Sequence, residues 1–166
     1  VGTADKVREL VDSVLPGNNI EVISNPEFLR EGFAVEDAMK PDRIVVGTES
    51  DYAREIIKDL YQPFVWSGNP IIFMDVKSAE ITKYAANTFL ATKISFMNDL
   101  SRYCEAVGAD IEKIRVGIGS DSRIGKRFLF AGIGYGGSCF PKDVRALIHS
   151  AKEAGTPLKI AQATHD

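Results

Sequence analysis

From Asp75 to Gly108 the sequence reads DVKSAEITKYAANTFLATKISFMNDLSRYCEAVG, and neither glycine nor proline interrupts it between Val76 and Val107. Asp75 is a residue type that caps helix N-termini, and Gly108 is the type that ends helices. At about 1.5 Å per residue, a helix over Val76–Val107 would be roughly 48 Å long, longer than a small domain is wide. We therefore predict one long helix that acts as a spine between domains or subunits.

Before this helix, short apolar strands alternate with helical segments, a pattern typical of parallel α/β architecture. We expect helices over Lys6–Leu15 and Tyr52–Tyr61, and strands over Ile20–Ser24, Arg43–Gly47 and Ile71–Met74. After the long helix the strands stop. Helices are expected over Asp110–Ile118, over Val144–Ala154 and from Leu158, all packed around the spine. The predicted fold is a partial parallel sheet over residues 1–75, followed by an all-helical domain over residues 76–166.

The composition is that of an ordinary soluble globular chain. It has 166 residues, of which 45% are hydrophobic, and a net charge of −3. The negative charge argues against nucleic-acid binding, and no apolar run approaches the roughly 18 residues of a membrane span. Two cysteines without a pairing pattern indicate a reducing compartment, so we expect a cytoplasmic protein. Three strands without a leading βαβ unit are unlikely to close a core, and we expect the chain to be a piece of a longer protein.

A glycine-rich run, Gly132-Ile133-Gly134-Tyr135-Gly136-Gly137-Ser138-Cys139-Phe140-Pro141-Lys142-Asp143, carries Cys139 to the start of the helix expected from Val144. Helix N-termini have unpaired N–H groups that favour a thiolate, and Lys142 adds positive charge. This pattern predicts a reactive thiol. The alternative is that the glycines only form a tight turn and that Cys139 is a small buried apolar residue.

The same run contains the dinucleotide pattern G-x-G-x-x-G at Gly132, Gly134 and Gly137. In a dinucleotide-binding fold this pattern opens a βαβ unit, with a second strand and an acidic residue further on. Here Pro141 follows at once and the later chain is helical. We therefore do not expect these glycines to bind a pyrophosphate.

Two further segments carry candidate chemistry. Lys83 and Asn87 are four residues apart on the long helix, so one helical face could offer an ammonium and an amide to one oxyanion. They could equally be a solvated lysine and a surface asparagine. Residues 25–32, NPEFLREG, follow the strand expected at Ile20–Ser24, where α/β sheets bind ligands. Their two carboxylates could be general bases or charges around a turn.

Four motifs occur in a fixed order: NPEFLREG at 25–32, KYAAN at 83–87, DSRIG at 121–125 and GGSCFPKD at 136–143. Together they closely resemble the UDP-glucose 6-dehydrogenase family, within the UDP-glucose/GDP-mannose dehydrogenases, over essentially the whole chain. The resemblance implies an α/β fold in which residues 1–75 are the end of a Rossmann-like NAD-binding domain. Residues 76–166 would be the central helical dimerisation domain with the catalytic cysteine. Because the family's other segments are absent, we expect this chain alone to be inactive.

The resemblance implies NAD-dependent four-electron oxidation of UDP-glucose to UDP-glucuronate through a thiohemiacetal and a thioester. It assigns Cys139 as nucleophile. Lys83 and Asn87 would stabilise oxyanions, Asp143 would position water or move protons, and Glu27 would activate water for thioester hydrolysis. Glu31 and Lys142 would lie near NAD. The residues assigned to the substrate are Phe28, Leu29, Arg30, Arg123, Phe130, Gly132, Gly134, Tyr135 and Gly136.

Several alternatives stay open. The sugar nucleotide could be GDP-mannose or another one, although residues 121–129 resemble the UDP-glucose branch more. The isolated chain could be a non-catalytic dimerisation module. A cysteine hydrolase would need a histidine partner, and neither His149 nor His165 stands in a recognisable signature. No metal is expected, since the cysteines and histidines lack the close pairs of zinc sites. The broad apolar surface of residues 76–107 and the resemblance both predict a homodimer, with Arg123 reaching the neighbouring subunit's substrate site.

Overall fold

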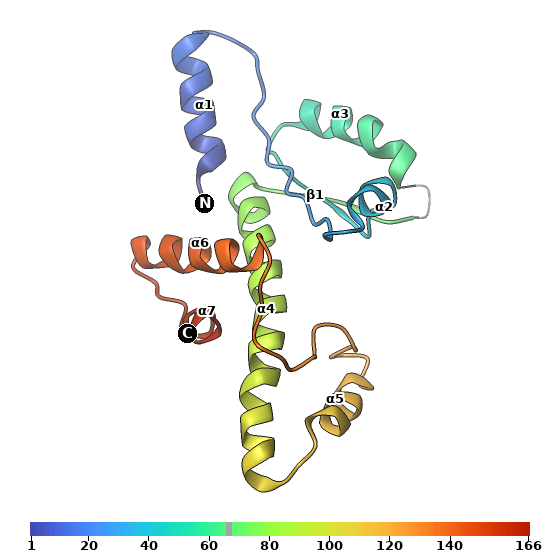
Figure 1. The fold of residues 1–166 in the computed structure, drawn as a ribbon. Coiled ribbons are helices and arrows are strands. Elements are labelled where there is room, and N and C mark those ends of the chain that lie inside the picture. The colour runs from blue at the N-terminus through green and yellow to red at the C-terminus, as the bar shows by residue number, and fades with distance from the viewer. Residues whose placement is uncertain (66–67) are drawn as a thin grey trace. The chain divides into compact units, whose positions relative to one another are not determined.

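The computed structural model describes residues 1–65 and 68–166 (Figure 1), which form two compact units, Val1–Lys83 and Tyr84–Asp166. In chain order, the elements are helix α1 (Thr3–Val14), helix α2 (Ala34–Met39), strand β1 (Ile44–Gly47), helix α3 (Asp51–Tyr61), 3₁₀-helix η1 (Gln62–Phe64), strand β2 (Ile71–Met74), helix α4 (Val76–Val107), helix α5 (Ile111–Gly119), helix α6 (Phe140–Glu153) and helix α7 (Lys159–His165). The predicted α/β class is confirmed, with a small parallel sheet followed by helices only.

The first unit is built on the parallel pair β1–β2, in which Ile44 lies opposite Ile71 and Gly47 opposite Met74. The β-branched residues of β1 suit a strand, and all four of its residues are buried. Ser50 caps the N-terminus of helix α3, because its hydroxyl accepts the Ala53 N–H at 3.2 Å. A hydrophobic core joins sheet and helix through Ile44, Val46 and Ile57, with Ile23, Tyr61, Val65, Ile71 and Phe73 packed against it.

The strand predicted over Ile20–Ser24 is wrong. Only Ser24 pairs, as an isolated antiparallel bridge in which Ser24 N–H donates to the Gly47 carbonyl at 3.0 Å and Gly47 N–H donates back at 2.7 Å. The apolar residues before it have strand propensity, but a strand also needs a neighbour for its N–H and C=O groups. The bridge nevertheless holds the start of residues 25–32 against the last residue of β1.

Helix α4 has the predicted bounds, Val76–Val107. An Asp75 carboxylate oxygen accepts the Ser78 N–H at 2.9 Å. Hydrogen bonds from the side chain and the backbone of Ser78 lower the pKa of Asp75. Gly108 follows the helix with φ 72°, a left-handed conformation that glycine adopts without strain. Near its start, α4 lies so close to β1 that a Cβ on Gly47 would be 2.7 Å from the Ala79 Cβ.

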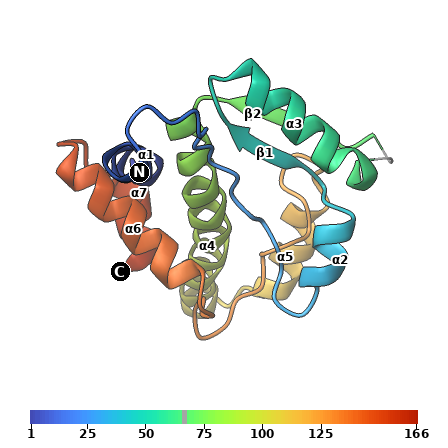
Figure 2. The ribbon, with the colours of Figure 1, turned by 90° about the horizontal axis from the view of Figure 1, so that it is seen from above.

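In the second unit, α6 and α7 lie to one side of α4 and α5 lies to the other (Figures 1 and 2). A core of Ala91, Val144, Ile148 and Ala161 joins α4, α6 and α7. Polar contacts add to it, because the hydroxyl groups of Thr92 and Thr164 lie 2.8 Å apart. The prediction that later helices pack on the spine is confirmed for α6 and α7.

Candidate active site

Cys139 is the N-cap residue of α6, which begins at Phe140, four residues earlier than predicted. The thiol is half-buried, and Ser138 Oγ lies 3.6 Å from Cys139 Sγ. Cys139 makes no side-chain capping hydrogen bond, and Pro141 in the first turn has no N–H to satisfy. The expectation of a cysteine at a helix N-terminus is therefore confirmed. Cys139 is not fully buried, whereas the other cysteine, Cys104, is 2% exposed.

Asp143, one turn into α6, makes the shortest buried side-chain contact described near the thiol. Asn87 Nδ2 on α4 donates to Asp143 Oδ2 at 2.6 Å, and the two residues are 8% and 2% exposed. Lys142 Nζ lies 3.4 Å from the other oxygen, Asp143 Oδ1, while its side chain is 69% exposed. The negative charge of Asp143 and its hydrogen bond raise the pKa of Lys142. A buried carboxylate is thus held by an amide and a solvated ammonium group.

Lys83 pairs with Glu27 in the first unit. Lys83 Nζ donates to Glu27 Oε1 at 2.8 Å, and the side chains are 16% and 55% exposed. The second oxygen, Glu27 Oε2, accepts the Leu29 N–H at 2.6 Å. The ring of Phe28 lies close to two cations, with the Arg43 guanidinium carbon 4.0 Å and Lys83 Nζ 5.6 Å from its centroid. Glu27 and Phe28 therefore both lie beside the lysine ammonium, and the Leu29 backbone holds the Glu27 carboxylate.

Arg30 is bound within its own segment. Its guanidinium donates to both oxygens of Asp37, at 2.6 Å from Nη2 to Oδ1 and 2.9 Å from Nε to Oδ2. This fork-shaped contact, together with the Arg30 N–H, lowers the pKa of Asp37 to about 2. Glu31 is exposed in the following turn. Any anion that approaches Arg30 would share the guanidinium with Asp37.

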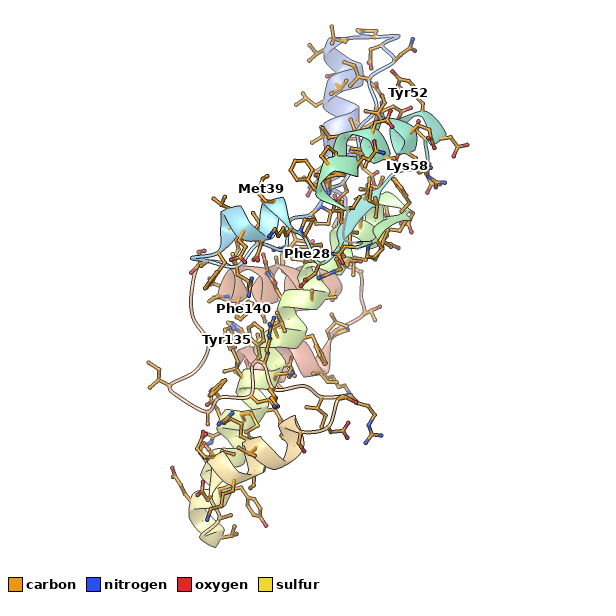
Figure 3. All side chains as sticks on the ribbon, turned by 90° about the vertical axis from the view of Figure 1, so that its right-hand side faces the viewer. Phe28, Met39, Tyr52, Lys58, Tyr135 and Phe140 are labelled. Atoms are coloured by element: carbon orange, nitrogen blue, oxygen red, sulfur yellow. The ribbon has the colours of Figure 1, made fainter. Side chains whose placement is uncertain are left out.

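The glycine-rich loop of the second unit is tied down at several points. Gly132 N–H donates to Asn98 Oδ1 on α4 at 2.7 Å, and the Arg115 guanidinium carbon lies 4.5 Å from the Phe130 ring centroid. Tyr135 packs with Phe140 at 6.3 Å between ring centroids, and Figure 3 shows these two side chains next to each other. Burial raises the pKa of Tyr135. Gly134 and Gly136 are both exposed, and Gly134 has a positive φ of 126°.

Arg123 lies in the turn after α5 and is 87% exposed at its side chain. Its Nη2 donates to Asp121 Oδ2 at 2.6 Å, and this pairing lowers the pKa of Asp121. The turn is also held to α4, because Lys93 Nζ donates to the Ile124 carbonyl at 3.0 Å. Arg123 therefore points its charge into solvent from an anchored turn.

The structure thus groups the predicted catalytic residues in two sets, each described within its own unit. Glu27 and Lys83 are paired in the first unit, and Asn87, Asp143 and Cys139 lie around the start of α6 in the second. The partners that sequence reasoning missed are Asp37, Arg43, Asn98 and Asp121. Asn98 could have been found from the sequence, because it follows Asn87 by eleven residues and so lies on nearly the same face of α4.

Family models match both parts of the chain. Residues 77–166 match the central domain of the UDP-glucose/GDP-mannose dehydrogenase family, and residues 1–65 match the NAD binding domain of the same family. The chain belongs to the UDP-glucose/GDP-mannose dehydrogenase family. The resemblance inferred from the four motifs is therefore confirmed.

The chain is also similar to individual UDP-glucose dehydrogenases, which supports this family assignment. The chain is 53% identical over 164 residues to UDP-glucose 6-dehydrogenase TuaD of Bacillus subtilis, covering 98% of this chain and 35% of the relative. It is 50% identical over 167 residues to a UDP-glucose 6-dehydrogenase of Pseudomonas aeruginosa, covering 98% and 37%. A solved UDP-glucose dehydrogenase from Pyrobaculum islandicum superimposes with a TM-score of 0.93 at 41% identity, covering 98% and 37%. The chain thus spans about a third of these proteins.

Within residues 1–65 and 68–166, no helix combines the length and the hydropathy that a membrane span needs. Nor do three or more histidine, cysteine, aspartate or glutamate side chains gather there in a way that could hold a metal ion.

Proposed function

We propose that this chain is the catalytic portion of an NAD-dependent dehydrogenase that oxidises the primary alcohol of a nucleotide sugar, UDP-glucose first among them, to a carboxylate. The observation that carries the proposal is the buried Asn87–Asp143 hydrogen bond of 2.6 Å beside the half-buried Cys139 thiol at the start of α6. The names of the B. subtilis and P. aeruginosa relatives support UDP-glucose as the substrate.

In this proposal Cys139 forms the covalent intermediates. Its thiolate adds to the carbonyl carbon of the aldehyde from the first oxidation, so that a C–S bond forms and the carbonyl oxygen becomes an oxyanion. Loss of hydride from this thiohemiacetal leaves a thioester. An amide nitrogen carries two hydrogens, and Asn87 gives one to Asp143. The second can be donated to the oxyanion, and the Lys83 ammonium adds positive charge.

Hydrolysis of the thioester needs a base. Glu27 is 55% exposed at its side chain and so accessible to water, and its Oε1 accepts a hydrogen bond from Lys83 Nζ at 2.8 Å. It would take a proton from a water molecule that attacks the thioester carbon. The C–S bond then breaks, Cys139 leaves as a thiolate and the sugar leaves as a carboxylate. Asp143 would hold the amide of Asn87 in place and order water near the thiol.

The residues assigned to NAD have suitable chemistry. Bound NAD⁺ would accept one hydride in each of the two oxidations. The exposed Glu31 carboxylate can accept hydrogen bonds from ribose hydroxyl groups, and the solvated Lys142 ammonium can attract an anionic ligand. In this proposal residues 1–75 contribute to the cofactor domain, and residues 76–166 form the catalytic and dimerisation domain.

The substrate would contact two segments. Phe28, Leu29 and Arg30 supply an aromatic ring, a backbone and a guanidinium that already binds Asp37. Phe130 supplies a second aromatic ring, and the half-buried Tyr135 lies in the loop that follows. The exposed Gly132, Gly134 and Gly136 supply backbone that a ligand can approach closely.

We also propose that the chain forms a homodimer through the central helices. Phe89, Phe96 and Tyr103 follow one another at intervals of seven residues on α4 and are 67%, 57% and 64% exposed. Such a row of aromatic side chains is unfavourable in water and fits a self-complementary interface of a two-fold dimer. Across it, Arg123 would reach the substrate of the neighbouring subunit. This row also favours the alternative that the isolated chain acts as a non-catalytic dimerisation module.

The test of activity uses a full-length protein that contains this chain, with NAD⁺ and a panel of nucleotide sugars including UDP-glucose and GDP-mannose. Two NADH should form for each UDP-glucose consumed, with UDP-glucuronate as product. Cys139→Ser should abolish acid formation, whereas Cys104→Ala at the buried thiol should keep it. No NADH with any nucleotide sugar would contradict the proposal. Activity with GDP-mannose alone would move the substrate to that branch.

A further inference from the structure

The glycine-rich loop is fixed by packing at its two ends. At the start, Leu129 is 2% exposed, and its Cδ1 lies 3.4 Å from where a Cβ on Gly119 of α5 would be. At the end, Tyr135 and Phe140 pack against the core of α4, α6 and α7 (Figure 3). The middle of the loop differs, because the Ile133 side chain is fully exposed. Packing therefore leaves the stretch around Gly132–Gly134 without apolar support.

A hollow borders this unsupported stretch. It has a volume of about 660 Å³, and its lining includes Asn98 on α4, Gly132 and Ile133 in the loop, and Ile160 and Thr164 on α7. Since open space separates the loop from α7 here, contact with α7 cannot set the position of Gly132. The hydrogen bond from Gly132 N–H to Asn98 Oδ1, at 2.7 Å, does so instead.

The backbone near the loop is also in an uncommon conformation. Phe128 has φ 63°, the one positive value at a non-glycine among the described residues, and its ring lies 6.1 Å from that of Phe140. A bulky residue keeps such a conformation only where its surroundings hold it. Phe128 comes directly before Leu129, the buried residue at the start of this loop, so the strained residue and the buried residue together constrain the backbone that leads to Gly132.

We propose that Asn98 is a positioning residue for substrate binding: its side-chain carbonyl fixes the Gly132 backbone, and with it the backbone groups that the loop presents to the nucleotide sugar. The inference rests on the proposed dehydrogenase function and adds to it a residue that touches the loop. Asn98 lies eleven residues after Asn87, so one face of α4 carries both the amide beside the thiol and the amide that holds the loop.

The matched variants are Asn98→Leu and Asn98→Asp. Leucine has nearly the shape of asparagine without an acceptor, whereas aspartate keeps an oxygen at the same place and accepts the Gly132 N–H as a carboxylate. Amide hydrogen exchange of Gly132, measured by NMR on this chain, should speed up about tenfold in Asn98→Leu and stay near the wild-type rate in Asn98→Asp. Exchange of the Asp143 amide, inside α6, is the internal control and should not change.

In a full-length protein that contains this chain, Asn98→Leu should raise KM for UDP-glucose about 3- to 10-fold while kcat changes less than twofold, because only substrate binding is weakened. Asn98→Asp should restore KM. Equal Gly132 exchange in all three proteins would overturn the proposed anchor, and faster exchange with an unchanged KM would overturn its role in binding. A wild-type protein that oxidises no nucleotide sugar would refute the proposed function, while Gly132 exchange would still decide whether Asn98 holds the loop.

Discussion

The buried Asn87–Asp143 pair offers the sharpest energetic prediction. A 2.6 Å hydrogen bond from a neutral amide to a carboxylate, with both residues less than 9% exposed, should contribute about 1.5–3 kcal/mol of coupling, since hydrogen bonds to charged groups are worth that much when desolvated. Truncating either partner alone also changes helix propensity and leaves the other group unpaired. A double-mutant cycle with Asn87→Ala, Asp143→Ala and the double variant cancels the propensity changes.

The assay is urea denaturation of this chain followed by circular dichroism at 222 nm, because the second unit is helical apart from its loops. The matched control is the exposed pair Glu55–Lys58, which has the same 2.6 Å separation but side chains 70% and 51% exposed. Its cycle should give about 0.5 kcal/mol or less. If the Asn87–Asp143 coupling is no larger than that of the exposed pair, the reasoning that burial makes this contact strong is wrong.

Three further predictions concern single sites. Gly47→Ala should destabilise the chain by about 1–3 kcal/mol, because the new Cβ would lie 2.7 Å from Ala79 Cβ and 2.8 Å from Val76 Cα. Gly117→Ala in α5, whose new Cβ would meet nothing within 4 Å, should stabilise the chain by about 0.5–1 kcal/mol, and equal urea midpoints for the two variants would contradict this. The pKa of the Asp37 carboxylate, measured by NMR, should be near 2 and should return toward its ordinary 3.8 in Arg30→Ala; an unchanged pKa in that variant would count against the pairing. Because the folded-state pKa is the lower one, the Arg30–Asp37 pair stabilises the fold above about pH 4 and loses this effect as the pH falls toward 2. Iodoacetamide should alkylate the half-buried Cys139 before Cys104, which is 2% exposed, and peptide mapping that finds equal rates in the folded chain would argue against an accessible thiol.

The parts of the fold that follow from local signals could be predicted from the sequence. Asp75 and Gly108 bound α4 because capping and the left-handed C-terminal turn depend on neighbouring residues only. Ile20–Ser24 shows the opposite case, since strand propensity is visible in the sequence but the pairing partner is not. Helix α2 was missed because it is short, although acidic residues in its first turn and Pro41 after its end were signals of a helix.

In the candidate site, too, local features could be predicted from the sequence and contacts between distant segments could not. The glycine turn and the helix start bring Cys139 to the N-cap of α6, and both are local features. The partners of the charged residues come from the packing of distant segments, as with Asn87 and Asp143, which are 56 positions apart. Arg30 and Asp37 are close in sequence, but their contact depends on the turn at Glu31-Gly32, where Gly32 has φ 83°, and this conformation could not be read from charge alone.

The central claim is that Cys139 carries a covalent acyl intermediate that Glu27 helps to hydrolyse. Its most direct test is intact-protein mass spectrometry of a full-length protein with Glu27→Gln, mixed with UDP-glucose and NAD⁺ and quenched in acid. We predict that a UDP-glucuronyl thioester accumulates and maps to Cys139, and that Glu27→Gln combined with Cys139→Ser shows none. Normal turnover of Glu27→Gln with no adduct on Cys139 would contradict the account.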